Sequence, residues 1–226
     1  MKKYIFIILL ISLAFKSNSH ENHYKDIKKI EMDVIRNGEI VWYSNYFFNH
    51  ADDKMIVKNN TNFKVDLFGI EIFSILSEST EIYEGNKLIS FKSNTMQNEK
   101  NKYVNLIFDK LSNSFVIDGS SYKGKASSDS IVGNWWNHDV LEKDKQISPL
   151  SGSIKEQNVI LLGTEEIIIN EKKFFTEHYK LKSKNENLPK DKRLDFDIWL
   201  NPRNKLILKV SYKRMGNWEY KIKNLK

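Results

Sequence analysis

The chain has 226 residues, of which 40% are hydrophobic and 12% aromatic, with a formal net charge of +7 and no cysteine. That apolar share is enough to build a folded core, so the composition excludes a disordered protein. The lack of cysteine excludes disulfides, thiolate metal sites and a cysteine nucleophile.

The N-terminus has the pattern of a secretory signal peptide. Two lysines follow the first methionine, an apolar run fills residues 4–15, and small polar residues lead to Ser19. The run is well short of the roughly 20 apolar residues of a spanning helix, which argues against a membrane anchor. We predict that residues 1–19 are a signal peptide. The mature chain, residues 20–226, is then one β-rich domain without a membrane span, periplasmic or secreted.

The positive charge is spread along the chain. Removal of the signal peptide takes away Lys2, Lys3 and Lys16 and lowers the formal net charge from +7 to +4. A protein that binds nucleic acid gathers its lysines on one face or helix, and this chain has no such cluster. We therefore expect no nucleic-acid partner and assign the lysines to solvated faces of a sheet.

Short runs of alternating apolar and polar residues fill residues 30–118, and Gly, Asn and Asp separate them. The first two runs flank Asn37-Gly38, a dipeptide typical of hairpin turns because both residues tolerate a positive φ. The pattern predicts strands at 30–35, 40–48, 54–66, 67–78, 80–83, 88–96, 103–108 and 115–117.

The region from residue 119 to residue 160 interrupts the strand pattern. Residues 119–130 are small and polar, which predicts a loop. Capping residues then favour a short helix over residues 129–136 and a second helical turn over residues 139–143. We expect a loop and short-helix excursion between two runs of strands.

Alternating patterns resume after Gly163, with a charged loop over residues 182–192 and a type I turn at Asn201-Pro202. Predicted strands cover 166–169, 174–181, 194–200, 206–212 and 218–222. Consecutive hairpins with one apolar face per strand imply an all-β fold, a curved antiparallel meander. So many strands favour a barrel, half-barrel or sandwich over a flat sheet.

Four motifs in this order resemble a family of uncharacterised secreted bacterial proteins, catalogued as domain of unknown function 6134. They are DVIRNGE at residues 33–39, EIYEGNKL at 81–88, GNWWN at 133–137 and DIWLNP at 197–202. The resemblance spans nearly the whole mature chain and implies no established activity. A looser likeness connects the last motif and the strand after it to periplasmic lipoprotein carriers. Those are curved half-barrels that hold acyl chains on their concave face.

Trp135, Trp136, His138 and Asp139 form the candidate ligand-binding cluster. Two indoles beside polar groups could line a pocket; alternatively, one indole plugs the end of a barrel while His138 and Asp139 cap the helix. A histidine beside an aspartate could also act as a base with an orienting carboxylate. Adjacent side chains point apart, however, and no nucleophile motif accompanies them. We predict no catalytic residue here.

The histidines lack a metal-binding pattern. His50, His138 and His178 could bind a metal with Asp52 or Asp139, but none has a recognisable ligand spacing. We therefore expect neither a metal nor a cofactor.

Aromatic doublets, Phe47-Phe48 and Phe174-Phe175, place apolar groups on both faces of their strands. Such strands are typical of a sheet covered on both sides or of one that lines an apolar cavity.

The leading functional hypothesis is therefore an exported envelope protein without enzymatic activity. It would bind a hydrophobic or amphipathic, lipid-like ligand, or a partner in the envelope. One alternative is an envelope hydrolase that uses His138 and Asp139. Another is a structural assembly factor that offers an exposed strand edge.

Overall fold

The computed structural model describes residues 24–68 and 70–225. The predicted signal peptide, residues 1–19, lies outside them. Within the described residues, no helix combines the length and the apolar character needed to cross a bilayer.

The described chain is all-β, as predicted, with two isolated 3-10 turns. An N-terminal run holds β1 (Lys29–Arg36), β2 (Glu39–Ala51), β3 (Lys54–Leu67), β4 (Ile70–Glu84), β5 (Lys87–Gln97), β6 (Lys100–Asp109), β7 (Ser114–Gly119) and β8 (Lys123–Ser127). A middle segment holds β9 (Ile131–Val132), η1 (His138–Leu141) and β10 (Lys145–Ile147). A C-terminal run holds β11 (Ile154–Ile169), β12 (Lys172–Ser183), η2 (Lys190–Lys192), β13 (Asp195–Asn201), β14 (Leu206–Lys213) and β15 (Asn217–Leu225).

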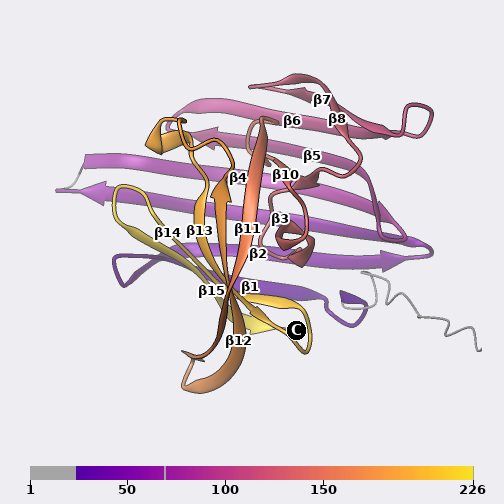
Figure 1. The fold of residues 1–226 in the computed structure, drawn as a ribbon. Helices are drawn as coiled ribbons and strands as arrows, with labels where there is room; N and C mark the ends of the chain where they lie inside the picture. The colour runs from indigo at the N-terminus through magenta and orange to yellow at the C-terminus, as the bar shows by residue number, and fades with distance from the viewer. Residues whose placement is uncertain (1–23, 69, 226) are drawn as a thin grey trace, which may run out of the picture.

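All the strands belong to one sheet, in the order β8-β7-β6-β5-β4-β3-β2-β1-β15-β14-β13-β12-β11-β10-β9. Neighbours are antiparallel except β9 and β10, which are parallel. Strand β1 pairs with both β2 and β15 and so joins the two runs. The strands of the two runs cross at a steep angle (Figure 1).

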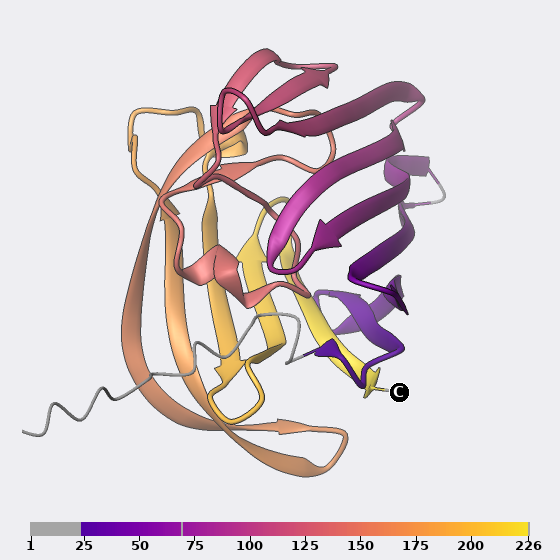
Figure 2. The same ribbon diagram turned by 90° about the vertical axis from the view of Figure 1, so that its right-hand side faces the viewer.

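The sheet curves until its two runs face one another as walls, with the middle segment between them (Figure 2). It stays open, because β8 and β9 form its two edges and do not pair with each other. The predicted curved antiparallel meander is thus confirmed, in a half-barrel arrangement. The twist that every strand adds relative to its neighbour accumulates into this curvature.

The first hairpin has the geometry that its sequence predicts. Asn37 and Gly38 have φ angles of 51° and 91°, the left-handed conformation that this dipeptide tolerates. The two strands predicted at residues 67–78 and 80–83 are one strand, β4, because the polar residues between them continue the ladder with β3 and β5.

Three predictions for the excursion are wrong. The loop predicted at residues 119–130 contains β8, whose polar sequence pairs with β7. The helix predicted over 129–136 is absent, because the β-branched residues of β9 are buried and pair with β10. Strand β11 begins at Ile154, within the predicted excursion, and its first residues pair with β10. In each case, ladder pairing with the strand next to it in the sheet overrode the local propensity of the segment.

The aromatic doublets do not mark a doubly covered sheet. Phe48 is buried between the walls, but its neighbour Phe47 is 38% exposed on the outer face. Phe175 is likewise 60% exposed. One aromatic ring of each pair therefore faces solvent, and the interpretation as a covered sheet or apolar cavity lining is wrong.

The end of β7 carries a close backbone approach that requires glycine. A Cβ at Gly119 would lie 2.7 Å from the carbonyl oxygen of Ser151 and 3.1 Å from Cα of Gly152. The backbone N–H of Ser121 donates to the same carbonyl at 2.9 Å. This contact holds the loop after β10 against the N-terminal wall.

We expect Gly119→Ala to lower the free energy of unfolding by about 1–3 kcal/mol, since overpacking a tight contact costs that much. Ser121→Ala, an exposed change in the same loop, should stay within about 0.5 kcal/mol of the parent. Urea unfolding followed by circular dichroism measures both. Equal stability of the two variants would contradict the close approach.

Candidate functional site

A buried carboxylate holds the middle segment against the N-terminal wall. Glu81, on the inner face of β4, is 1% exposed. Its Oε1 accepts hydrogen bonds from Nε1 of Trp136 at 2.9 Å and from Nδ2 of Asn134 at 2.6 Å. Its Oε2 accepts from the hydroxyl of Tyr83 at 2.7 Å. The three donors satisfy a group that would be costly to bury alone.

The environment of Glu81 changes its proton affinity. Burial raises the pKa of this carboxyl to about 7, against the opposing effect of the hydrogen bonds from Trp136, Tyr83 and Asn134. Desolvation therefore outweighs the three donors, because it disfavours the charged form. Glu81 titrates near neutral pH.

Trp136 is the plug between the two walls. Its ring packs edge-on against Tyr24, Phe48 and Tyr83, at centroid distances of 5.0, 5.4 and 5.7 Å. Its backbone carbonyl accepts a hydrogen bond from the Tyr24 hydroxyl at 2.7 Å. Of the two readings of the tryptophan pair, the core plug describes Trp136.

Trp135 lies on the opposite side of the segment. Its ring is half-buried and packs edge-on against Phe196 of β13 at a centroid distance of 4.9 Å. It also lies 6.3 Å from the ring of Tyr220 on β15. The two neighbouring indoles therefore lie in different environments, since Trp136 enters the core and Trp135 faces a cavity.

That cavity lies between the two walls and has a volume of about 580 Å³. Its floor is formed by the inner face of β2, β3 and β4, and the middle segment borders it through Gly133, Asn134 and Trp135. A volume of this order falls in the range of binding sites for small molecules.

The floor of the cavity is polar. Ser44, Thr61 and Ser77 stand directly opposite one another on β2, β3 and β4. The hydroxyls of Ser44 and Thr61 are 2.9 Å apart, and Nδ2 of Asn59 donates to Ser44 at 3.1 Å. Ser79 completes the floor. These small side chains leave space and offer hydrogen bonds to a ligand.

The walls of the cavity are aromatic, and its mouth is basic. The aromatic lining consists of Tyr46, Phe63, Trp135, Phe196, Tyr212 and Tyr220. The basic lining consists of Lys155, Lys190, Arg193, Lys213 and Arg214. All of these cations except the half-buried Lys155 are exposed, which places them at the mouth.

Backbone contacts fix the loop at the mouth. Nε of Arg193 donates to the carbonyl of Leu188 at 2.5 Å, and the Arg214 guanidinium donates to the carbonyl of Asp191. Asp195, the acidic residue of the lining, pairs instead with Lys180 at 2.7 Å. Across residues 24–68 and 70–225, none of the five basic residues of the lining forms an ion pair with a carboxylate. The mouth is therefore positively charged.

The amino-acid sequence matches a known protein family. Residues 32–223 match the family described as Domain of unknown function (DUF6134). The chain belongs to this family. The suspected resemblance is thereby confirmed, and it brings no activity with it.

A solved structure has a fold similar to that of this DUF6134 protein. It is the crystal structure of a beta-barrel-like protein of domain of unknown function DUF1849 from Brucella abortus. The TM-score is 0.58 at 9% sequence identity, over 88% of this chain and 96% of that chain. At this identity the likeness shows the fold alone. No curated protein matches the sequence.

His138 and Asp139 lie away from the cavity of the DUF6134 protein. Nδ1 of the buried His138 is 3.2 Å from the Tyr24 hydroxyl, and its Nε2 is 3.7 Å from Oδ1 of Asp139. The cap of η1 is Asn137, whose Oδ1 accepts from the backbone N–H of Asp139 at 2.9 Å. The cap is thus Asn137 and not His138 or Asp139, as the alternative interpretation expected, while Asp139 lies in the first turn of the helix. Of the four predicted site residues, Trp135 alone belongs to the described lining of the cavity.

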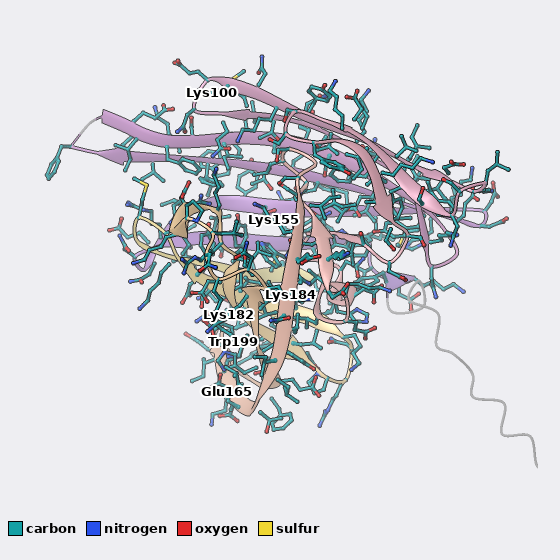
Figure 3. The ribbon with its side chains drawn as sticks, turned by 45° about the horizontal axis from the view of Figure 1, so that its top comes forward. Lys100, Lys155, Glu165, Lys182, Lys184 and Trp199 are labelled. Carbon is teal, nitrogen blue, oxygen red and sulfur yellow. The ribbon has the colours of Figure 1, made fainter. Side chains whose placement is uncertain are left out.

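The other two candidate histidines serve different parts of the sheet. Nε2 of His50 donates to the carbonyl of Tyr24 at 3.1 Å. His178 lies between Glu165 and Asp197, with ring-nitrogen to oxygen distances of 3.0 and 3.1 Å. Its ring stacks on Trp199, whose indole donates to Glu165 at 2.5 Å. Glu165 and Trp199 lie side by side on the C-terminal wall, away from Lys155 (Figure 3).

Sequence reasoning missed Glu81 and the hydroxyl floor. The signal was present as polar residues at inward positions of period-two strands, such as Ser44, Ser77 and Glu81. Two of the motifs that carry the family resemblance, residues 81–88 and 133–137, meet at Glu81. Neither motif contains a local signal that predicts this contact.

The two tryptophans should differ in their effect on stability. We expect Trp136→Ala to cost about 3–5 kcal/mol, the usual range for a buried tryptophan. Trp135→Ala should cost less, about 1–2 kcal/mol, because the half-buried ring borders a cavity. Urea unfolding monitored by far-ultraviolet circular dichroism gives both values. A larger cost for Trp135 would reverse the assignment of plug and lining.

The raised pKa of Glu81 predicts a pH-dependent stability. An unfolded glutamate titrates near 4.5, so between about pH 4.5 and pH 7 the folded state binds more protons than the unfolded state. The contribution of Glu81 to the free energy of unfolding is therefore fully present below that window and is lost as pH rises through it. Glu81→Gln cannot titrate, so its stability relative to the parent should increase across the window, by up to roughly 3 kcal/mol.

Chemical unfolding at a series of pH values tests this prediction. Glu78→Gln, an exposed change on the same strand, controls for the loss of one surface carboxylate. Stability curves for Glu81→Gln and the parent that run parallel between pH 4.5 and pH 7 would show that Glu81 does not titrate there.

Proposed function

We propose that the mature, exported protein binds a small amphipathic ligand that carries an anionic group, without enzymatic activity. The observation that carries this proposal is the basic mouth over a cavity of about 580 Å³ with aromatic walls and a hydroxyl-lined floor. The signal-peptide pattern of residues 1–19 supports a periplasmic or secreted location.

The charge of the mouth supports an anionic ligand. Lys190, Arg193, Lys213 and Arg214 are exposed, and carboxylates of the described chain do not neutralise them by ion pairing. Like charges held together repel one another, and a bound anion relieves that repulsion. Guanidinium groups also bind carboxylate, phosphate and sulfate groups with two parallel hydrogen bonds.

The lining supports an amphipathic ligand over a purely hydrophobic one. Aromatic rings such as Phe196 and Tyr212 offer apolar faces to a hydrocarbon or ring body. The floor offers hydroxyls, such as those of Ser44 and Thr61, and each has an acceptor site that an alkyl chain would cover without a hydrogen bond. A ligand with polar groups along an apolar body satisfies both surfaces.

The position of His138 and Asp139 supports binding over hydrolysis. A base must lie within hydrogen-bond reach of the proton that it takes from a bound substrate or its attacking water. Both residues lie outside the described lining of the cavity, on the side of the middle segment that faces Tyr24.

Two related fluorescent probes test the charge preference. Anilinonaphthalene sulfonate is an aromatic anion, and phenylnaphthylamine is a neutral compound with the same ring system. We expect the protein to bind the anion more tightly. Arg193→Glu should weaken anion binding by about tenfold, equivalent to about 1.4 kcal/mol, and leave binding of the neutral probe unchanged.

Arg203→Glu is the matched control, because Arg203 is exposed in the turn between β13 and β14 and does not line the cavity. It should leave the affinity for both probes unchanged. If both variants lost the same affinity for the anionic probe, the preference for the anion would reflect the net charge of the protein and not the basic mouth.

Native mass spectrometry of protein purified from its own envelope should show a bound anionic amphiphile. A protein that is free of such ligands and also fails to bind the anionic probe would refute the proposal.

A further inference from the structure

We propose that His138, Asp139 and Glu142 form a binding site for a divalent transition-metal ion. The three residues each offer one ligand atom, and these atoms all lie within 4.8 Å of one another. This site lies on the side of the middle segment away from the cavity and does not depend on the proposed ligand-binding function.

The local backbone brings the three side chains together. A 3-10 turn has three residues per turn, so Asp139 and Glu142 project from the same side of η1. The backbone N–H of Glu142 donates to the carbonyl of Asp139 at 2.9 Å and fixes that turn. His138 precedes Asp139 directly, and its Nε2 lies 3.7 Å from Oδ1 of Asp139.

Tyr24 orients the imidazole from behind. Its hydroxyl donates to the carbonyl of Trp136 at 2.7 Å, so its single proton is engaged there. The oxygen, 3.2 Å from Nδ1 of His138, therefore acts as the acceptor of a proton on that nitrogen. When the ring is neutral, a proton on Nδ1 leaves Nε2 unprotonated, and the lone pair of Nε2 points toward Asp139. Metal-binding histidines are held in the same way, by a hydrogen bond from the ring nitrogen that does not bind the metal.

The distribution of charge around the site also favours a cation. Lys143 and Lys145, the lysines that follow η1, pair with Asp129 and Glu156 at 3.9 and 3.6 Å. Glu142 is exposed and forms no ion pair within the described chain. It can therefore move toward an ion that His138 and Asp139 hold.

The donor set selects the class of metal. An imidazole nitrogen suits Zn²⁺ and its neighbours in the transition series, whereas Ca²⁺ and Mg²⁺ prefer all-oxygen sites. One nitrogen and two carboxylates leave at least one position for water in a tetrahedral site. The expected ion is Zn²⁺ or Mn²⁺. The sequence predicted no metal site because His138 and Asp139 lack a recognisable ligand spacing. Glu142 was not among the candidate ligands there.

Titration of metal-free, untagged protein with Zn²⁺ tests the site by calorimetry and by thermal melting. We expect one Zn²⁺ per chain with a raised melting temperature, and binding of Ca²⁺ at least tenfold weaker. Asp139→Asn and Glu142→Gln should each weaken Zn²⁺ binding by tenfold or more, and Tyr24→Phe by about tenfold through loss of the orienting contact. Asp144→Asn, an exposed change in the same segment, should have no effect.

His138→Gln should abolish binding, and its melt without metal reports whether the fold survives the change. If that variant does not fold, the exposed Glu142 and partly exposed Asp139 still decide the outcome. The proposal is overturned if Zn²⁺ does not bind at millimolar concentration. It is also overturned if Asp139→Asn and Glu142→Gln bind Zn²⁺ as the parent does, or if Ca²⁺ binds as tightly as Zn²⁺.

Discussion

Burial of the Glu81 carboxyl is the constraint on which the interior of this half-barrel depends. A carboxyl group in the core is tolerated only when donors surround it, and the donors come from Tyr83 on the same strand and from Asn134 and Trp136 on the middle segment. The segment can supply them only if it crosses the space between the walls. Trp136 points toward Glu81, and its neighbour Trp135 lines the cavity.

The cavity itself follows from a change of side-chain size along the inner face of the N-terminal wall. Near Trp136 the inward residues are large and apolar, such as Phe48, Met55 and Phe91, and they fill the space between the walls. Midway along β2, β3 and β4 the inward residues become small and polar, and a cavity opens where Ser44, Thr61 and Ser77 stand. A second apolar cluster that includes Phe63 and Trp218 closes the core beyond them. Side-chain volume thus decides where the half-barrel is packed and where it is open.

The middle segment separates two chemically different surfaces. On one side it faces a cavity with a basic mouth and hydroxyl groups, suited to an anionic amphiphile. On the other side, η1 and its C-cap residue Glu142 present one imidazole and two carboxylates, suited to a divalent metal ion. Both surfaces depend on the same backbone course, which the contacts of Glu81 and Tyr24 hold in place. A change in the position of this segment would therefore alter the two proposed sites together.

The sequence by itself determined the local features of this protein. Period-two patterns, Asn37-Gly38 and the other turn signals predicted an all-β antiparallel meander, because alternation and turn chemistry act over a few residues. Only the tertiary structure decided that β1 pairs with the distant β15 and so joins the two runs. The tertiary structure likewise decided that β8, β9 and the first half of β11 are strands, since pairing with β7, β10 and β12 stabilises them. It also decided that Glu81 meets Trp136, 55 residues away, and that Trp135 and Trp136 serve different environments. Such contacts depend on how the curved sheet brings distant residues together, and no local pattern in the sequence encodes which partners will meet.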